Sequence, residues 1–419
     1  MFVLICLTAA FSTPAGGSHK PDYTSDLSVW PNSTSYKNSD PWIAEHHDSI
    51  RRLEPRVLVL NFANCFTTDQ MEAKTERMIH ALAESSRYHG FNDRKAPSVL
   101  NYEVFRYIDL KDESPPPGRE KKNGRLFPKR ADYDGKGQNC DYGKFFTEEY
   151  AKYYNVKDPR KEKRLLSLEE MIELGIIHEL WFWCVHDEEG APLETIEEKQ
   201  YYSRTLKPIR GRHGPAGNGH SSTLPWVGRS FRVTFFNHNR GIGCGLENFS
   251  HAMEGMAHYG FCPYYKKYFY EFAEFNLDEK YGLPFNSFYG ASRIDGWKVR
   301  HTSPTSFEYH HDGAIRSCDG YEAIAGNVHF PPGAKSDYDM KTNVPVMSTM
   351  EHYRLRDGPN KKDLAEEWKM ERFYRYNELA PDGMGPWLVY WRQCMPGLDN
   401  KCLDDARKPM KNWWIFLFY

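Results

Sequence analysis

The sequence predicts an α/β fold in which helices flank a mostly parallel central sheet, in the Rossmann-like, doubly wound manner, with long irregular insertions. Residues 56–62 (RVLVLNF) form a continuous run of branched apolar residues, which is typical of a strand buried on both faces. A helix-spaced segment, 69–89, with Asp69 as its N-cap, and a second strand pattern, 103–110, follow at short intervals. This order of elements indicates a right-handed crossover and therefore a parallel pair of strands.

The same unit recurs further along the chain. Residues 167–175 predict a short helix that Ser167 caps, and residues 176–184 (IIHELWFWC) predict a third strand. Residues 230–237 (SFRVTFFN) predict a fourth strand, which a glycine turn joins to a helix at about 245–259. The recurrence favours a single sheet built from successive strand–helix units.

One domain accounts for most of the chain. We expect it to span 51–419, with insertions at about 111–165, 186–228 and 260–320. Residues 18–50 predict a polar N-terminal arm. Residues 1–17 combine a short apolar run with small residues, which predicts a signal peptide and hence a secreted, extracellular protein.

Cysteine and asparagine patterns agree with secretion. Removal of Cys6 with the signal peptide leaves eight cysteines, an even number that suits disulfides in an oxidising compartment. Cys394 and Cys402 bracket a Pro-Gly turn and predict one such disulfide. Asn32 begins an Asn-Ser-Thr sequon, so we expect a glycoprotein.

The charge balance excludes some classes of partner. The chain carries 55 basic and 57 acidic residues, a formal net charge of -2, which gives no long-range field for nucleic acid. No apolar run is long enough to span a membrane, and we expect a monomer. The turn 241–245 (GIGCG) lacks the third glycine of a dinucleotide-binding fingerprint, because Leu246 stands there, so we expect no nucleotide cofactor.

The helix at 245–259 carries the strongest functional signal. Glu247, His251, Glu254 and His258 follow one another at helical spacing and form one polar stripe opposite an apolar face. The alternative is a solvated helix face. Against it, residues 241–265 contain no lysine or arginine, whereas an exposed face commonly mixes both signs.

Two further segments are candidates for the same site. His329 ends a strand pattern before a Pro-Pro turn, and Asp337 and Asp339 follow at a spacing that projects two carboxylates together. Residues 237–240 lie at the carboxyl end of the fourth strand, where open α/β sheets bind ligands. Either segment can instead be ordinary loop chemistry.

These patterns lead to an assignment of roles by chemistry. The predicted metal ligands, for zinc or calcium, are His251, Glu254 and His329. The predicted acid/base groups are Glu247, Glu254, Asp337 and Asp339. The predicted substrate-binding residues are Asn237, His238, Asn239 and Arg240.

The two motifs also support a resemblance. Residues 247–254 fit ExFxHxxE, residues 329–339 fit HFxPxxxxDYD, and 412–414 (NWW) resembles the matching end of the chain. The sequence from about residue 55 onward is therefore similar to a family of secreted, largely uncharacterised bacterial and fungal proteins. The resemblance implies that the two motifs share one site, and it implies no reaction.

The sequence leaves three functions open. The first is a secreted hydrolase of an extracellular polymer, a glycan rather than a peptide, because sugar rings stack on abundant Trp and Tyr. The second is a noncatalytic glycan-binding or adhesion protein with a structural metal or none. The third uses Cys244 beside His251 as a thiol nucleophile.

Overall fold

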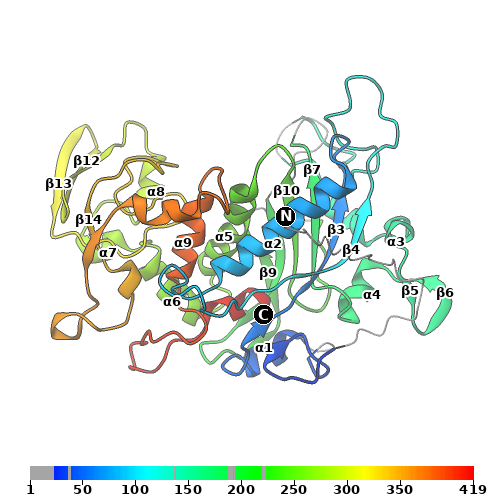
Figure 1. Ribbon diagram of the computed structural model, residues 1–419, viewed down its shortest axis with the longest axis horizontal. Helices are drawn as coiled ribbons and strands as arrows, with labels where there is room; N and C mark the ends of the chain where they lie inside the picture. Colours follow the sequence, from blue (N-terminus) through cyan, green and yellow to red (C-terminus); the bar gives the residue numbers. More distant parts are fainter. Residues whose placement is uncertain (1–22, 36–38, 136–137, 187–191, 193, 219–222) are drawn as a thin grey trace, which may run out of the picture.

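A six-stranded mixed sheet forms the centre of the molecule, in the order β4-β3-β7-β10-β8-β9 (Figure 1). The computed structural model describes residues 23–35, 39–135, 138–186, 192, 194–218 and 223–419. Neighbours are parallel across β4 (Glu103–Asp109), β3 (Arg56–Asn61), β7 (Glu179–Cys184) and β10 (Phe231–Asn237). A hairpin of β8 (Thr195–Tyr202) and β9 (Pro208–Ala216) completes the sheet. β8 pairs antiparallel with β10, and β9 pairs antiparallel with β8 at the edge. The predicted α/β class is confirmed, and the hairpin inside the predicted 186–228 insertion makes the sheet mixed.

The central strands bury both faces in two separate apolar cores. In β3, Val57 and Val59 join one core, while Leu58 and Leu60 join the other. The first core lies under α2 (Thr68–Ser85), α5 (Ile242–His258), α6 (Pro263–Phe272) and α9 (Gly385–Gln393). The second lies under the short elements η1 (Tyr142–Phe146), α3 (Glu148–Tyr154) and α4 (Leu168–Glu173), beside which β5 (Lys157–Asp158) and β6 (Lys161–Leu165) form a small hairpin. Helices thus cover both sides of the sheet, as continuous apolar strands require.

The first residues of α2 and α4 are set by the side chains that cap the two helices. Ser167 and Glu170 form a capping box at α4, as predicted. At α2, the N-cap is Thr67 with Gln70 as its partner, so the prediction of Asp69 as the cap was wrong by two residues. Capping requires a side-chain oxygen aimed at a free backbone N–H, and Thr67 has the extended backbone that allows it.

Backbone N–H groups of the glycine turn at the start of α5 bind the carboxylate of Asp382, which lies far along the chain. Asp382 accepts hydrogen bonds from the backbone N–H groups of Gly241, Gly243 and Cys244 at 3.0, 2.8 and 3.4 Å. A Cβ atom on Gly241 would lie 2.2 Å from the Asp382 carboxylate, and one on Gly243 would lie 2.0 Å from its carbonyl oxygen. These two glycines therefore serve close packing around Asp382.

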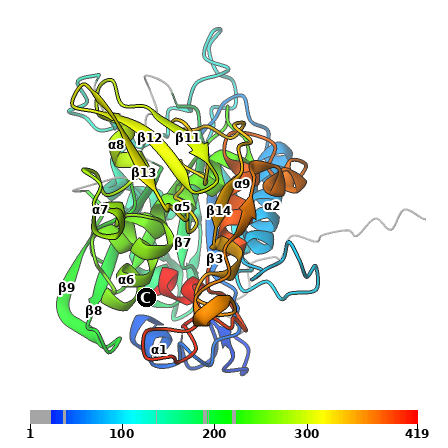
Figure 2. The same cartoon turned by 90° about the vertical axis from the view of Figure 1, so that its left-hand side faces the viewer.

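A second group of elements covers the outer side of α5 and α9 (Figures 1 and 2). It contains the three-stranded antiparallel sheet β11 (Val299–Ser303), β12 (Ser306–His311) and β13 (Ala314–Asp319) and the strand pair β14 (Val346–Ser348) and β15 (Glu366–Trp368). Its short helices are α7 (Leu277–Tyr281), α8 (Phe288–Ser292), η2 (Met350–His352), η3 (Pro359–Lys361) and η4 (Met370–Tyr376). Residues 327–339 run between β13 and β14 and face α5.

Both ends of the described chain pack against the sheet domain. In the N-terminal arm, β1 (Val29–Trp30) pairs in parallel with β2 (Arg52–Leu53), and α1 (Ser39–Glu45) lies beside the C-terminal η5 (Trp413–Phe418). The C-terminal segment, 413–419, is buried against the rest of the domain. Asn32 is also buried, and its amide donates to the Val29 carbonyl at 2.7 Å, so the folded chain leaves no space for a glycan there. The predicted signal peptide lies outside the described residues.

The cysteines do not form the predicted framework. No disulfide joins the cysteines of the described residues, and Cys394 and Cys402 in particular are separate thiols, so the expected disulfide is absent from this part of the chain. Cys402 instead contacts the Tyr88 hydroxyl at 3.3 Å. The sequence spacing of Cys394 and Cys402 around the Pro-Gly turn does not by itself predict a disulfide, because the two Cβ atoms must also face each other.

A buried ion cluster connects the sheet to the C-terminal segment. It consists of Glu179, Glu197, Lys199 and Arg232, whose side chains are at most 3% exposed. Arg232 pairs with Glu179 at 2.9 Å and with Glu197 at 3.2 Å. It also donates to the Leu417 carbonyl at 2.9 Å. Each charge in the cluster therefore has an opposite partner.

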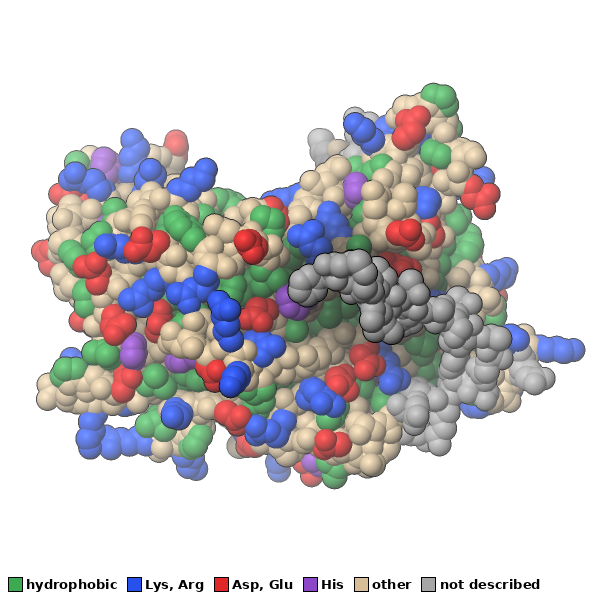
Figure 3. Space-filling model, viewed as in Figure 1, with side chains coloured by type: hydrophobic (Ala, Val, Ile, Leu, Met, Phe, Trp, Pro, Cys, Tyr) green, Lys and Arg blue, Asp and Glu red, His purple; other side chains and the backbone are tan. Residues whose placement is uncertain are grey.

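On the face shown in Figure 3, acidic and basic side chains are intermixed without a large region of one sign. Within the described ranges, no helix combines the length and the apolar character needed to cross a bilayer.

Candidate metal centre

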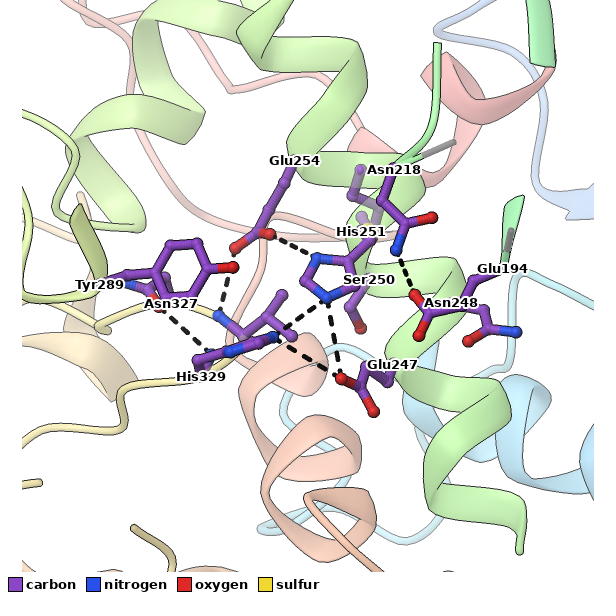
Figure 4. Close-up of polar contacts among 12 residues, drawn as sticks. Glu194, Asn218, Glu247, Asn248, Ser250, His251, Glu254, Tyr289, Asn327 and His329 are labelled. Carbon is purple, nitrogen blue, oxygen red and sulfur yellow. Dashed lines mark hydrogen bonds and ion pairs between the residues drawn. The ribbon is translucent and has the colours of Figure 1, made fainter. Parts of the chain in front are cut away.

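The structure brings the two predicted motifs together on the outer side of α5. The Nε2 atoms of His251, on α5, and His329, in the 327–339 segment, are 3.1 Å apart (Figure 4). Glu247, one turn before His251, places Oε1 3.8 Å from His251 Nε2 and 3.6 Å from His329 Nε2. Two imidazole nitrogens and one carboxylate oxygen thus converge on one point.

Each imidazole is oriented by a carboxylate on its far side. Glu254 Oε2 lies 2.8 Å from His251 Nδ1, and Asp337 Oδ1 lies 2.7 Å from His329 Nδ1. A carboxylate at Nδ1 favours the tautomer that carries its proton there, which leaves Nε2 with a free lone pair. The two carboxylates therefore turn both Nε2 lone pairs toward Glu247.

The His329 loop is held rigidly against α5 and α9. The Asn327 side chain accepts the backbone N–H groups of His329 and Phe330, both at 3.2 Å. Trp387 and Trp391 on α9 donate their indole N–H groups to carbonyls of residues 326–328, each at 3.2 Å. Packed aromatic donors thereby fix the loop that carries His329.

Glu254 also connects the two halves of the site. Its Oε1 accepts the backbone N–H of Val328 at 3.3 Å, while its Oε2 contacts His251 (Figure 4). The predicted metal ligands were His251, Glu254 and His329, but Glu247 holds the converging position. Side chains on a helix lean toward its N-terminus, so the Nε2 atom of His251 lies nearer to Glu247 than to Glu254.

The electrostatics of the site favour a positive charge at its centre. Burial alone lowers the pKa of His251, but hydrogen bonds to Glu247 and Glu254 outweigh it and raise that pKa to about 10. The pKa of His329 is lowered, first by burial and then by the charge of His251. Although burial opposes it, contacts with His251 and Tyr338 hold the pKa of Glu247 below its usual range.

Tyr338 covers the site from the solvent side. Its hydroxyl donates to Glu247 Oε1 at 2.9 Å, and its ring lies 4.3 Å from that of His329. The residue is 48% exposed and has a left-handed backbone, with φ of 58°. Such a conformation is costly for a large side chain and is common at functional sites.

The other predicted site residues have different positions. Asp339 accepts the backbone N–H groups of Lys335, Lys341 and Thr342 at 3.0 to 3.1 Å, so it stabilises its own turn, and these contacts give no support to the predicted acid/base role. Local Asx-type bonding of this kind is the alternative that the sequence had left open. His258 lies on the exposed C-terminal turn of α5, beyond the converging atoms.

Of residues 237–240, Arg240 alone has a described contact with the site. Its Nη2 lies 3.8 Å from Glu247 Oε2, and its side chain is 48% exposed. Asn237 accepts the backbone N–H of Asn239 within the turn, and His238 packs on Phe66 at 4.4 Å. Substrate binding by these other three residues therefore has no support in the geometry.

Cys244 is unsuited to the thiol mechanism. Burial, the largest effect, raises the pKa of its thiol to about 12. Both ring nitrogens of His251 already face other groups.

Two residues of the site were missed in the sequence. Tyr338 lies within the 329–339 motif, in which the spacing of Asp337 and Asp339 indicated a role for the carboxylates alone. Glu194 is largely buried near the site and contacts Asn218, and burial raises its pKa. Glu194 comes from the 186–228 insertion, and no local pattern distinguishes it.

The atoms present fit a divalent ion. Glu247, His251 and His329 each offer one ligand atom, and these atoms all lie within 4.8 Å of one another. Two imidazoles favour zinc or another transition metal over calcium, which prefers oxygen ligands. This buried Glu/His/His group could hold a metal ion.

Comparisons of the chain with protein-family models, with curated proteins and with solved structures gave no match. The resemblance to a secreted family therefore stays a prediction from the two motifs.

Proposed function

We propose that the chain is a secreted, metal-dependent hydrolase of an extracellular polymer, a glycan rather than a peptide. The observation that carries the proposal is the convergence of His251 Nε2, His329 Nε2 and Glu247 Oε1, with a carboxylate behind each imidazole. Two histidines and one glutamate are a ligand set of hydrolytic zinc enzymes. The secreted location rests on the N-terminal sequence alone.

The residues around the ligands have separate tasks in this proposal. Glu254 and Asp337 orient the imidazoles, and Tyr338 donates its hydroxyl to the ligand oxygen of Glu247. A bound ion supplies a water of lowered pKa and polarises the bond to be cleaved. Tyr338 and Arg240, each 48% exposed, can contact a substrate at the edge of the site.

A glycan suits the aromatic surroundings of the ligands. The rings of Tyr289 and Tyr338 lie 4.6 and 4.3 Å from that of His329, and Tyr338 is half exposed. An aromatic face at the edge of a polar site provides apolar area for a sugar ring.

The test is hydrolysis of a panel of neutral glycans, acidic glycans and peptides by zinc-loaded protein. We expect cleavage of a glycan that disappears after chelation and in His251→Ala, and that persists in His352→Ala, whose imidazole pairs with Asp357 elsewhere. Cleavage that survives chelation and His251→Ala would overturn the proposal.

A noncatalytic glycan-binding protein with a structural metal is the second candidate. The ligand side chains of Glu247, His251 and His329 are 4%, 11% and 6% exposed, and structural metal sites are closed in this way. Metal-dependent stability together with no hydrolysis of any panel member would favour this function.

A further inference from the structure

A long acid-free stretch ends at the metal centre. Residues 199–246 contain eight lysines and arginines and no aspartate or glutamate, although the whole chain has 55 basic and 57 acidic residues. Lys199 and Arg232 belong to the buried ion cluster, Arg229 lies near Asp40, and Arg240 contacts Glu247. The other four cations all lie on the β8–β9 hairpin, so the imbalance is concentrated there.

The four cations of the hairpin are exposed and uncompensated. They are Arg204, Lys207, Arg210 and Arg212. Within the described part of the chain, none of them forms an ion pair. Glu198, an acid of the same hairpin, lies 2.6 Å from His213 Nδ1. Because successive strand residues point to opposite faces, that pair faces away from Arg212.

Tyrosine rings lie close to the cations of the hairpin. The Arg212 guanidinium carbon lies 4.6 Å from the centre of the Tyr201 ring. Tyr201 packs against Phe261 at 4.2 Å, and Phe261 lies 6.2 Å from Tyr259, which is 43% exposed at the end of α5. Arginine and aromatic side chains therefore share one surface, which we call the hairpin surface and define by Tyr201, Arg204, Lys207, Arg210, Arg212 and Tyr259.

The hairpin surface connects directly to the metal centre. Gly217, just after β9, lies so close to α5 that a Cβ on Gly255 would be 2.9 Å from the Gly217 nitrogen. The next residue, Asn218, contacts Glu194 beside the site (Figure 4). From Asn218 back to Arg212, the strand covers about 20 Å. Figure 2 shows the hairpin at the lower left, next to α6.

We propose that the hairpin surface binds an acidic polysaccharide that extends into the metal centre. Carboxylate or sulfate groups of the polymer pair with the exposed arginines, and its rings pack on Tyr201 and Tyr259. This inference names the substrate class of the proposed hydrolase and therefore rests on the proposed function. Nucleic acid is disfavoured, because the net charge of -2 gives no long-range attraction for a phosphate backbone.

The experiment measures binding of chelator-treated protein to polygalacturonate, to neutral dextran and to a single-stranded DNA oligonucleotide of equal charge. Arg210→Ser/Arg212→Ser is expected to weaken binding to polygalacturonate by about tenfold, because two exposed charge pairs are lost. The matched control is Lys298→Ser/Arg316→Ser, which removes two exposed cations near the β11–β13 sheet and should change binding less than twofold. Tyr259→Ser is expected to weaken binding by about threefold.

Each outcome decides the proposal. Equal effects of the two double variants, or equal binding of dextran and polygalacturonate, would contradict it, and tighter binding of the DNA would replace the substrate class. Because the protein is metal-free, no turnover enters the measurement. Binding that behaves as expected, together with absence of hydrolysis in the metal-loaded protein, would refute the proposed function and leave the hairpin surface standing.

Discussion

Two charged clusters lie buried on the α5 side of the sheet, and they differ in their balance of charge. The buried ion cluster sets two carboxylates, Glu179 and Glu197, against two cations, Lys199 and Arg232. In the metal centre, three carboxylates face the imidazoles, those of Glu247, Glu254 and Asp337, and the described contacts oppose them with one arginine, Arg240. In the form that binds a metal, with both imidazoles neutral, these carboxylates outnumber the arginine by two.

The difference extends to hydrogen bonding. In the ion cluster, donors face acceptors: Tyr102 and Trp181 each donate to Glu179 at 2.8 Å. In the metal centre, two ring nitrogens and an acceptor oxygen of Glu247 face one another. Glu247 Oε1 accepts the Tyr338 hydroxyl, and a positive species between the three atoms, a proton or a metal ion, would also give the two ring nitrogens a partner. A buried cluster of balanced charge stabilises the fold, whereas a buried cluster with an excess of acidic groups is suited to a positively charged ligand.

The largest effect is expected from Arg232→Met, which leaves Glu179 buried without a cation and Glu197 with Lys199 alone. We expect a loss of about 3–5 kcal/mol in the free energy of unfolding, measured by chemical denaturation. Arg300→Met is the control, because its pair with Glu308 is exposed and contributes at most about 1 kcal/mol. Similar losses in the two variants would mean that the ion cluster is not the structural element described above.

Added zinc should stabilise the metal centre without affecting the ion cluster. At a free zinc concentration of one hundred times Kd, the free energy of unfolding is expected to rise by about 2.7 kcal/mol. The increment should disappear in His329→Ala and persist in Arg232→Met and His352→Ala. An equal increment in His329→Ala would place the zinc elsewhere.

The carboxylates behind the imidazoles should have a smaller effect on the metal. Glu254→Gln and Asp337→Asn are each expected to weaken zinc affinity by about 10- to 100-fold, or about 1.4–2.7 kcal/mol, because they orient the ligands without binding the ion. Competition with a chromogenic chelator measures the affinity. Asp339→Asn is the matched control, since its carboxylate bonds to its own turn. A loss of affinity in Asp339→Asn as large as in Asp337→Asn would contradict these roles.

Asp382→Asn should have the smallest effect, outside both clusters. It weakens the acceptor of the N–H groups at the start of α5, and we expect a loss of about 1 kcal/mol in unfolding free energy with zinc affinity unchanged. Thermal denaturation with and without zinc measures both. Unchanged stability would show that the glycine turn does not depend on this contact.

Local sequence patterns were sufficient for the central strands and their helices. Continuous apolar runs located β3, β7 and β10, because such runs are buried on both faces whatever the rest of the chain does. The β8–β9 hairpin was missed, because the glycines and histidines of 186–228 predicted an irregular insertion there. Its place in the sheet depends on pairing with β10, which no local pattern reveals.

For the site, too, local patterns predicted the segments that take part but not the contacts between their side chains. The four-residue spacing of Glu247 and His251 places both on one helix face, and the 329–339 motif suggested a partner. Which carboxylate meets which ring nitrogen depends on side-chain direction and on the loop held by Trp387 and Trp391. The disulfide prediction failed for the same reason, because spacing along the chain does not give the orientation of two thiols.

The central claim is that Glu247, His251 and His329 bind one divalent ion, and the most direct test is the metal content of purified protein after zinc loading and dialysis. We predict about one equivalent of zinc in the unaltered chain and in His352→Ala, and almost none in His251→Ala or His329→Ala. Zinc retained at one equivalent by both ligand variants, or absent from the unaltered chain, would contradict the account.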